Sequence, residues 1–232
     1  MPLLLVVLVF NSCEEDDENP TPVIETGTMA DVEGNEYTTV KIGSKWWMAE
    51  NLRVTKYRNG NPIPFVQNTI DEWSTSLDAY CSYSPTAPGF LYNWSAVNNP
   101  SQLAPEGWHI PSDDEWKELE KHLGMTNDQA EGTGWRGDDQ GEKLKMEGNS
   151  GWSVYDGIWS TNESGFSAEA GSCIMFDGKS GFPGLQYHGF WWSITEHDSN
   201  NSWYRYLDYK NKDVFRSHGN KHYGFSVRCI KD

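Results

Sequence analysis

The segment PSDDEWKELEKHLG, residues 111–124, carries the clearest structural signal in this chain. Ser112 is a favourable N-cap residue, and Glu115, three positions later, completes a capping box. Apolar side chains then recur at helical spacing along one face, at Trp116, Leu119 and Leu123, and Gly124 supplies a stop. The pattern predicts an amphipathic helix over residues 112–123. Capping and solvation account for its acidic residues, which are Asp113, Asp114, Glu115, Glu118 and Glu120.

The segments around this helix read as short strands. Residues 37–42 alternate, Gly43 and Ser44 form a turn, and residues 45–48 resume, which predicts a hairpin. Residues 59–62 (NGNP) are a turn signal, and residues 68–88 read as a long loop that contains Cys81. Further strands are predicted at residues 166–170, 172–176, 189–194, 203–209, 213–216 and 223–230. Short antiparallel strands around one main helix, joined by long irregular loops, indicate an α+β domain.

The composition limits the class of protein. A chain of 232 residues fits one domain, or one domain with a tail. Its 12 Trp and 22 Gly favour strands and turns over a helical bundle. The net charge of −16 would repel a phosphate backbone, so we expect no nucleic-acid partner.

The first residues indicate export. Residues 1–10 (MPLLLVVLVF) are too few to cross a bilayer, which takes roughly 20 apolar residues, but they suit the core of a signal peptide. Ser12 is a small residue directly before Cys13, as at the cleavage site of bacterial lipoproteins. We predict a signal peptide over residues 1–12 and lipid attachment at Cys13. The alternative is a buried N-terminal strand in which Cys13 occurs by chance.

An acidic segment follows Cys13. Residues 14–18 are all Asp or Glu, and Pro20 and Pro22 oppose helix and sheet pairing, so residues 13–26 are predicted to be a disordered tether. Such a run after a lipidated cysteine resembles the signal that sends lipoproteins of Bacteroidota to the outer face of the outer membrane. We therefore expect a lipid-anchored protein of the outer membrane that faces the cell exterior. A plain linker on a periplasm-facing protein is the alternative.

Seven segments of the remaining chain together resemble one family. They are residues 40–57 (VKIGSKWWMAENLRVTKY), 89–100, 103–124, 141–148, 161–171, 189–207 (GFWWSITEHDSNNSWYRYL) and 224–232 (GFSVRCIKD). In this order they look like the Fibrobacter succinogenes major paralogous domain, found mostly in lipoproteins and secreted proteins, and the resemblance covers residues 27–232. It implies a C-type lectin-like fold, similar also to the sulfatase-modifying-factor group. Fold alone does not assign function.

The resemblance also bears on the cysteines. With Cys13 lipidated, three remain, which permits at most one intrachain disulfide. Cys81 and Cys229 stand at positions similar to family cysteines, so their pairing is the one the resemblance implies. Formylglycine-generating relatives hold copper with two thiolates, for which Cys173 and Cys229 would have to converge. The spacing of the cysteines does not favour this, and we expect a domain that is not an enzyme.

Two groups of residues have side chains that could bind a metal ion, but each is explained more simply as part of a polar turn. His218 and His222 are predicted to flank a three-residue hairpin loop, and zinc would need a third ligand, for which Asp208 or Asp213 would have to reach over. Asp138, Asp139 and Glu142 offer carboxylates for calcium but lack the order of a calcium loop. We expect polar turns, no metal site and no cofactor, with calcium as the alternative.

Aromatic residues in Gly-rich loops give the remaining functional signal. Trp135, Trp152, Tyr155 and Trp159 lie in such surroundings, where a flat ring is unfavourable unless it packs or binds. We predict that they contact a ligand from the loop regions 130–160 and 196–222. The first hypothesis is a recognition domain for glycan or protein ligands, and the second is a structural component of the cell envelope or an assembly. A modifying-factor-like metalloenzyme is the third.

Overall fold

The computed structural model describes the chain except for residues 1–23, 67–69, 85–86, 88, 149–150 and 176–185. The predicted signal peptide and Cys13 therefore lie outside the described residues. The helices of the described part are α1 (Ile70–Thr75), α2 (Trp94–Val97), α3 (Asp113–His122), α4 (Asn127–Glu131) and α5 (Gln140–Leu144). Its strands are β1 (Thr26–Ala30), β2 (Glu36–Ile42), β3 (Lys45–Met48), β4 (Tyr80–Cys81), β5 (Leu91–Asn93), β6 (Trp108–His109), β7 (Gly134–Arg136), β8 (His188–Glu196), β9 (Asn201–Asp208), β10 (Val214–Asn220), β11 (Gly224–Phe225) and β12 (Ile230–Lys231).

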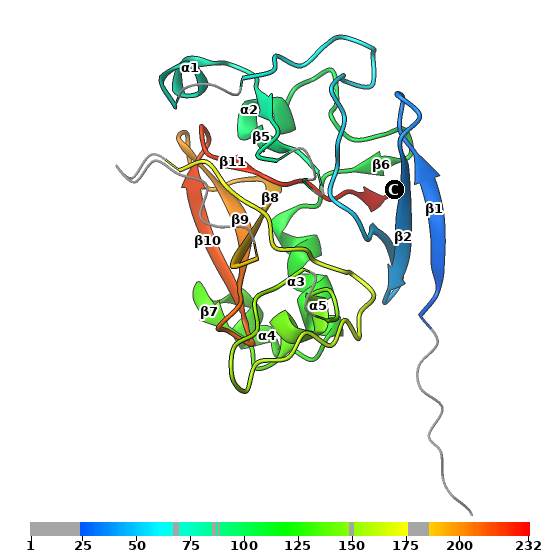
Figure 1. Cartoon of the computed structure of the whole chain (residues 1–232), viewed down its shortest axis with the longest axis vertical. Helices are drawn as coiled ribbons and strands as arrows, with labels where there is room; N and C mark the ends of the chain where they lie inside the picture. Colours follow the sequence, from blue (N-terminus) through cyan, green and yellow to red (C-terminus); the bar gives the residue numbers. More distant parts are fainter. Residues whose placement is uncertain (1–23, 67–69, 85–86, 88, 149–150, 176–185) are drawn as a thin grey trace, which may run out of the picture.

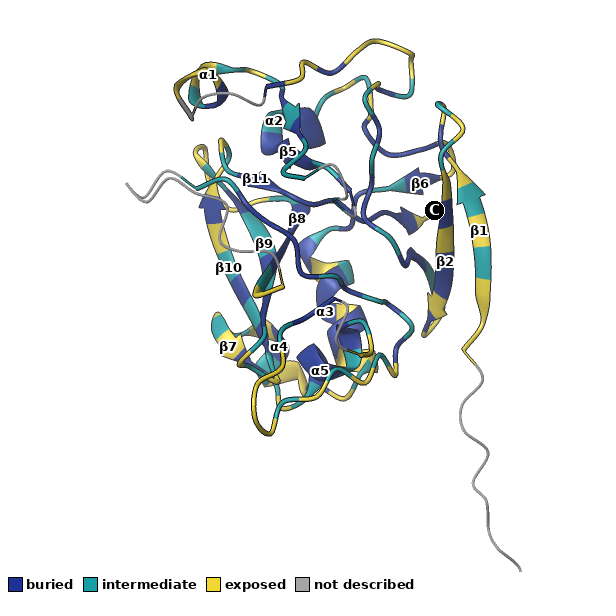
Figure 2. Ribbon diagram, in the orientation of Figure 1, coloured by how far each residue is buried: buried dark blue, intermediate teal, exposed yellow. Residues whose placement is uncertain are grey.

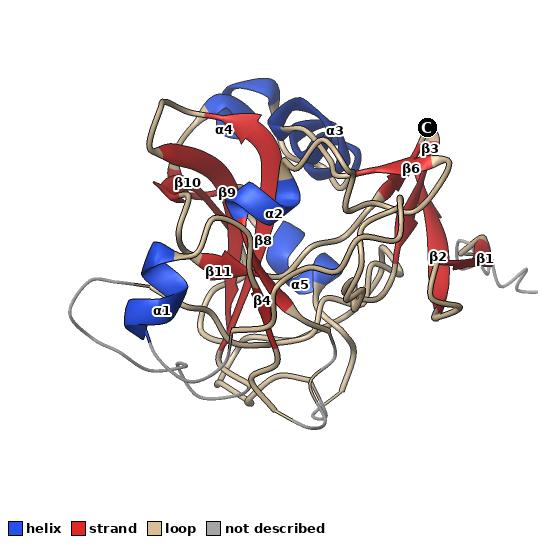
Figure 3. Cartoon of the chain, turned by 90° about the horizontal axis from the view of Figure 1, so that it is seen from above, coloured by secondary structure: helices blue, strands red, loops and turns tan. Residues whose placement is uncertain are grey.

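The strands form three small sheets. A five-stranded sheet has the order β1-β2-β3-β12-β6, a four-stranded sheet the order β7-β10-β9-β8, and a three-stranded sheet the order β11-β5-β4. All paired strands in them are antiparallel. Helix α3 lies between the two larger sheets (Figure 1), α2 lies beside β8 and α1 lies at the periphery (Figure 3). The predicted α+β class is confirmed.

The two strongest local predictions are confirmed. In α3 the Ser112 hydroxyl accepts a hydrogen bond from the Glu115 amide, and the Glu115 carboxylate accepts one from the Ser112 amide. Such a cap contributes about 1 kcal/mol. Strands β2 and β3 form the predicted hairpin, with Ile42 opposite Lys45. Gly43 lies in the turn at a φ of 63°, a conformation that favours glycine.

Helix α3 joins the two larger sheets through one hydrophobic cluster. The Trp116 ring lies 5.2 Å from that of Trp47 on β3. The same cluster contains Leu119 from the helix and Trp191 and Leu207 from the four-stranded sheet. Burying a Leu or Trp side chain of this kind contributes roughly 1.5–3 kcal/mol. Figure 2 shows this interior, with the middle of β8 buried, whereas β7 at the sheet edge has an exposed position at Trp135.

Two predictions about other segments were wrong, and a third differs at its end. Residues 68–88 contain α1 and β4 rather than an uninterrupted loop. Residues 13–23 of the predicted tether lie outside the described residues, and only its end differs from the prediction, because β1 begins at Thr26 and the Lys41 amide donates to the Glu25 carbonyl. Residues 166–170 and 172–175 form isolated bridges instead of strands. Here the buried Arg228 side chain takes the carbonyls of Phe166 and Ser167, which a neighbouring strand would otherwise use.

In the described part of the chain, no helix has both the length and the hydropathy that a bilayer crossing requires.

Candidate functional site: an exposed aromatic ridge

One face of the four-stranded sheet is built of aromatic rings. The strand register sets Trp135 of β7 opposite Phe215 of β10, Phe215 opposite Tyr206 of β9, and Tyr206 opposite Phe190 of β8. The ring centroids are 5.2, 5.7 and 4.4 Å apart in that order. Phe190 is buried in the core, whereas Trp135 is 37% exposed. The row thus runs from the core to the surface.

A second group of rings lies beside this row, where β8 begins and β9 ends, and its Tyr209 packs against the cluster that contains Leu207. Tyr187 stands 4.9 Å from Tyr209, and Tyr209 stands 5.8 Å from Tyr155. Tyr155 is 45% exposed and Tyr187 is 41% exposed. The two groups meet at His188, whose ring lies 5.7 Å from Tyr206 and 6.3 Å from Tyr187. We call this surface the aromatic ridge, and its rings are Trp135, Tyr155, Tyr187, Tyr206, Tyr209 and Phe215.

Polar groups lie in the middle of the ridge. The Tyr206 hydroxyl donates to the Asp208 carboxylate at 2.7 Å, and His188 Nδ1 lies 2.8 Å from the same hydroxyl. Burial lowers the pKa of His188 despite the neighbouring Asp208, so the ring is neutral near pH 7. Lys210 Nζ lies 5.1 Å from the Tyr209 ring and 5.5 Å from that of Tyr155. The ridge therefore combines flat rings with hydrogen-bond donors and acceptors.

Trp159 projects from a loop whose backbone is held in place. Its indole is 68% exposed. The Trp159 amide donates to the buried Glu142 carboxylate at 2.8 Å, and the Thr161 amide donates to the Glu142 carbonyl at 3.0 Å. Ile158, the preceding residue, forms a bridge with Tyr155. A large exposed ring on a fixed backbone can contact a ligand at a low cost in conformational entropy.

Trp152 does not belong to this surface, and the prediction for it was wrong. Its ring is 3% exposed and packs in the same cluster as Phe166 and Leu144. The indole N–H donates to the Ala168 carbonyl at 2.7 Å, and Lys145 Nζ lies 5.2 Å from the ring. The Trp152 side chain is therefore part of the core and cannot reach a ligand.

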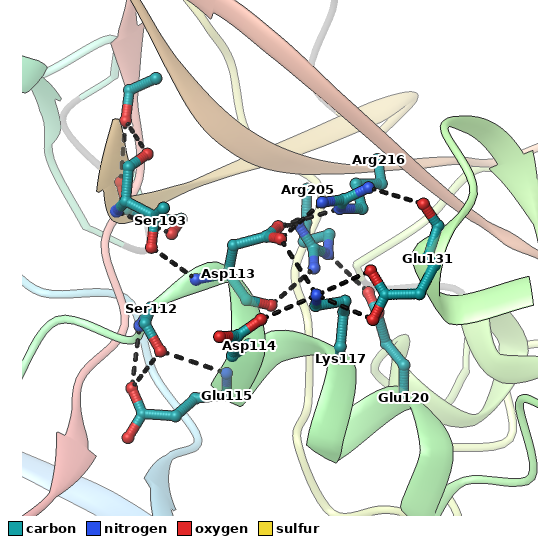
Figure 4. Close-up of polar contacts among 12 residues, drawn as sticks. Ser112, Asp113, Asp114, Glu115, Lys117, Glu120, Glu131, Ser193, Arg205 and Arg216 are labelled. Atoms are coloured by element: carbon teal, nitrogen blue, oxygen red, sulfur yellow. Dashed lines mark hydrogen bonds and ion pairs between the residues drawn. The ribbon is translucent and has the colours of Figure 1, made fainter. Parts of the chain in front are cut away.

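The opposite face of the same sheet holds a network of buried charges (Figure 4). The Asp113 carboxylate accepts hydrogen bonds from Arg205 at 2.7 Å and from Arg216 at 2.6 Å. Glu120 accepts from Arg205 at 2.6 Å and forms an ion pair with Arg136 at 2.8 Å. All five side chains are buried. The network ties helix α3 to strands β7, β9 and β10.

This network corrects the interpretation of the acidic residues of α3. Capping explains Glu115, and solvation explains the exposed Asp114 and Glu118. Asp113 and Glu120 instead face the sheet. Burial alone would raise the pKa of Asp113, but the hydrogen bonds from Arg216 and Arg205 lower it from 3.8 to about 2.

Comparison with known families identifies the chain. The family model described as the Fibrobacter succinogenes major domain matches residues 40–231. The chain belongs to this family. The match includes the whole four-stranded sheet and the ridge, while strand β1 precedes it. Comparison with curated proteins and with solved structures found no match.

The Fibrobacter succinogenes major domain of this chain lacks the implied disulfide. Cys81 and Cys229 are free thiols. They pack in different clusters, Cys81 with Trp73 and Leu91, and Cys229 with Val227 in the main core. Burial raises the pKa of Cys81 to about 12 and also raises that of Cys229. The thiols of this domain are therefore core groups, and the predicted pairing was wrong.

One further prediction was wrong, and the structure also gives the partners of the acidic residues considered for calcium. Strand β10 continues to Asn220, with His218 opposite Trp203, so His218 and His222 do not flank a hairpin loop. The carboxylates proposed for calcium have separate partners: Asp139 pairs with Lys143 at 2.9 Å, and Glu142 accepts from the Trp159 amide.

Sequence reasoning found Trp135, Tyr155 and Trp159 but missed Tyr187, Tyr206 and Tyr209. The alternation of residues 203–209 does place Tyr204 and Tyr206 on the side of the strand opposite Arg205. That signal indicates an aromatic face. It does not show which end of the face stays open, because exposure also depends on strand β7, which comes from a distant part of the chain.

Proposed function

We propose that this protein is a cell-surface lipoprotein whose domain binds glycans through the aromatic ridge without catalysing a reaction. The observation that carries the proposal is the exposure of Trp135, Tyr155 and Tyr187 in one continuous set of ring contacts. Exposed apolar surface of this kind marks binding sites, since a soluble protein otherwise buries it.

The chemistry of the ridge favours a sugar over an apolar ligand. Flat rings can stack on the C–H faces of a pyranose, and the half-buried His188 and Tyr206 place polar atoms beside them for sugar hydroxyls. The buried Asp208 orients the Tyr206 hydroxyl. Lys210 adds a positive charge at one end, which suits an acidic sugar. A protein ligand, or a structural role in an envelope assembly, would use the same apolar surface and is distinguished by experiment.

Anchoring and fold complete the proposal. Lipid on Cys13 and the acidic residues 14–18 would hold the domain at the outer membrane, facing the exterior. A C-type lectin-like arrangement is supported by the small antiparallel sheets, one main helix and long loops. Mass spectrometry of the purified protein should find a lipidated Cys13 at the N-terminus, and Cys13→Ser should release the protein from the membrane. An unmodified chain that keeps residues 1–12 would contradict the anchor.

A glycan-array screen with and without calcium tests the binding proposal. We expect saturable binding to a limited set of glycans, lost in Trp135→Ala and in Tyr155→Ala. Phe65→Ala is the matched control, because Phe65 is an exposed ring that contacts Tyr80 outside the ridge. No binding to any glycan, together with self-association that the ridge variants abolish, would favour the structural role. Equal loss in all three variants would exclude the ridge as the site.

A further inference from the structure

Two histidines and an aspartate meet at the other end of the four-stranded sheet. His197 and Asp198 lie in the turn between β8 and β9, and His218 lies on β10. Each offers a ligand atom, and these atoms lie within 4.8 Å of one another. All three residues are exposed. The ridge rings come from the opposite ends of the same strands, so this cluster is separate from the proposed glycan site.

The cluster is organised by ring and backbone contacts. The imidazoles of His197 and His218 stack with centroids 3.7 Å apart and an interplanar angle of 7°. The Trp203 indole meets both rings edge to face, at 5.0 and 5.7 Å. The turn is closed by the His197 amide, which donates to the Asn201 carbonyl at 3.0 Å. The two imidazoles are therefore held side by side although they come from distant positions in the chain.

The Asp198 carboxylate is fixed toward the histidines. Its Oδ1 accepts hydrogen bonds from the Asn200 and Asn201 amides at 2.8 and 2.9 Å. Its Oδ2 lies 3.0 Å from His197 Nδ1. The Asn201 side chain donates to both oxygens. A carboxylate oriented by a second set of hydrogen bonds is typical of metal ligands.

We propose that His197, Asp198 and His218 form a zinc site. Two imidazoles and one carboxylate are a ligand set that Zn²⁺ accepts, and three protein ligands leave a fourth position open to water or a partner group. With Zn–N distances of about 2.0–2.1 Å, tetrahedral ligand atoms stand roughly 3.3 Å apart. Zinc binding would require the two imidazoles to turn out of their parallel stack, because the lone pairs of the ring nitrogens lie in the ring planes and must point at one ion.

The charge and the ligand atoms of the cluster favour zinc over calcium and magnesium. Calcium and magnesium take oxygen ligands, so two imidazoles disfavour them. With neutral imidazoles the three ligands carry one negative charge. The nearby Lys221 is paired with Glu196 at 3.3 Å, and Arg216 is paired with Asp113. The charge of each cation is thus offset by a carboxylate partner. Zinc bound here would tie β10 to the turn between β8 and β9.

Isothermal titration of the chelator-treated protein with Zn²⁺ tests the site. We expect one ion per chain with a Kd below about 100 µM, and a loss of at least roughly tenfold in affinity in His197→Ala and in His218→Ala. Asp198→Asn, which keeps an acceptor for the turn amides, should also weaken binding. His222→Ala is the matched control, because His222 lies four residues from His218 but outside the cluster.

Three results would overturn the proposal. One is the absence of saturable Zn²⁺ binding in this range, and another is binding that His197→Ala and His218→Ala leave unchanged. The third is a His222→Ala variant that loses as much affinity as they do. Thermal unfolding in chelator shows whether each variant is folded, and zinc should raise the melting temperature of the parent protein and of His222→Ala only.

Discussion

The two faces of the β7-β10-β9-β8 sheet reverse the usual distribution of side chains. The face toward α3 buries Arg136, Arg205 and Arg216, whereas the other face leaves Trp135 and the neighbouring tyrosines partly exposed. Along β9 the reversal occurs between adjacent residues, because Arg205 and Tyr206 point to opposite sides. Ordinary soluble proteins place charges outside and large rings inside.

The two faces have different roles: the α3 face stabilises the fold, and we propose that the aromatic face binds the ligand. Arg136, Arg205 and Arg216 on the α3 face each pair with a carboxylate, so positive and negative charges balance in this buried network. On the aromatic face, Trp135 contacts the rings of Tyr206 and Phe215 and keeps 37% of its surface exposed. Substitutions on the first face should therefore reduce the free energy of unfolding. Substitutions on the second should reduce ligand binding.

The largest effect is expected from breaking the charge network. Glu120→Ala leaves Arg205 and Arg136 without their shared carboxylate, and a buried charge left unpaired costs about 3–5 kcal/mol. Urea unfolding monitored by tryptophan fluorescence measures this loss in the free energy of unfolding. Glu118→Ala, an exposed change on the same helix, is the control and should stay within about 0.5 kcal/mol. Equal effects of the two variants would show that the network does not stabilise the fold.

A comparable effect is expected from one of two similar tryptophans. Trp152→Ala removes a buried ring and should destabilise the protein by about 3–5 kcal/mol. Trp159→Ala removes an exposed ring and should change the free energy of unfolding by less than about 0.5 kcal/mol. Thermal denaturation of both variants decides between them. Similar melting temperatures would contradict the division into core and surface.

The acid limit of stability should reflect Asp113. Because its pKa is lowered from 3.8 to about 2 by folding, its ionised form stabilises the folded state above pH 4. That contribution, about 2 kcal/mol, should be lost as the pH falls from 4 to 2. Unfolding free energies measured across this range should fall less steeply in Asp113→Asn. Identical pH profiles would show that Asp113 titrates in the same way in the folded and unfolded chain.

A smaller loss of stability than for Asp113, Trp152 or Glu120 is expected on the ridge. Trp135→Ala removes a half-exposed ring and its contacts with Tyr206 and Phe215, which should cost about 1 kcal/mol. Chemical denaturation of the variant measures this cost. A loss as large as that of Trp152→Ala would mean that Trp135 is a core residue and that the ridge is not a free surface.

Local signals were sufficient to predict much of the fold. Ser112 and Glu115 identify the start of α3, and the alternation of residues 37–48 around Gly43 identifies the β2–β3 hairpin. Both patterns are complete within a few residues. The role of Asp113 is not local, because its partner Arg205 lies 92 residues away in the sequence. In the sequence, a carboxylate in the first turn of a helix indicates a favourable contact with the helix dipole, whether the side chain is exposed or pairs with a distant arginine.

The candidate site shows the same limit. Trp152 and Trp159 have similar Gly-rich surroundings in the sequence, yet one is buried and the other exposed. What separates them is the Ala168 carbonyl beside the first indole and the Glu142 carboxylate that fixes the loop of the second. Likewise, β10 brings His218 next to His197. In the sequence, His222 is the nearer histidine and is therefore considered as the partner of His218.

The most direct test of the account is a titration with the best-binding glycan from the array. The Trp135→Ala/Tyr155→Ala double variant should bind at least roughly a hundredfold more weakly than the parent protein, at about 1.4 kcal/mol or more per ring. The control Phe65→Ala should bind like the parent. A double variant that stays folded and binds with the parent's affinity would contradict the claim that the ridge is the recognition surface.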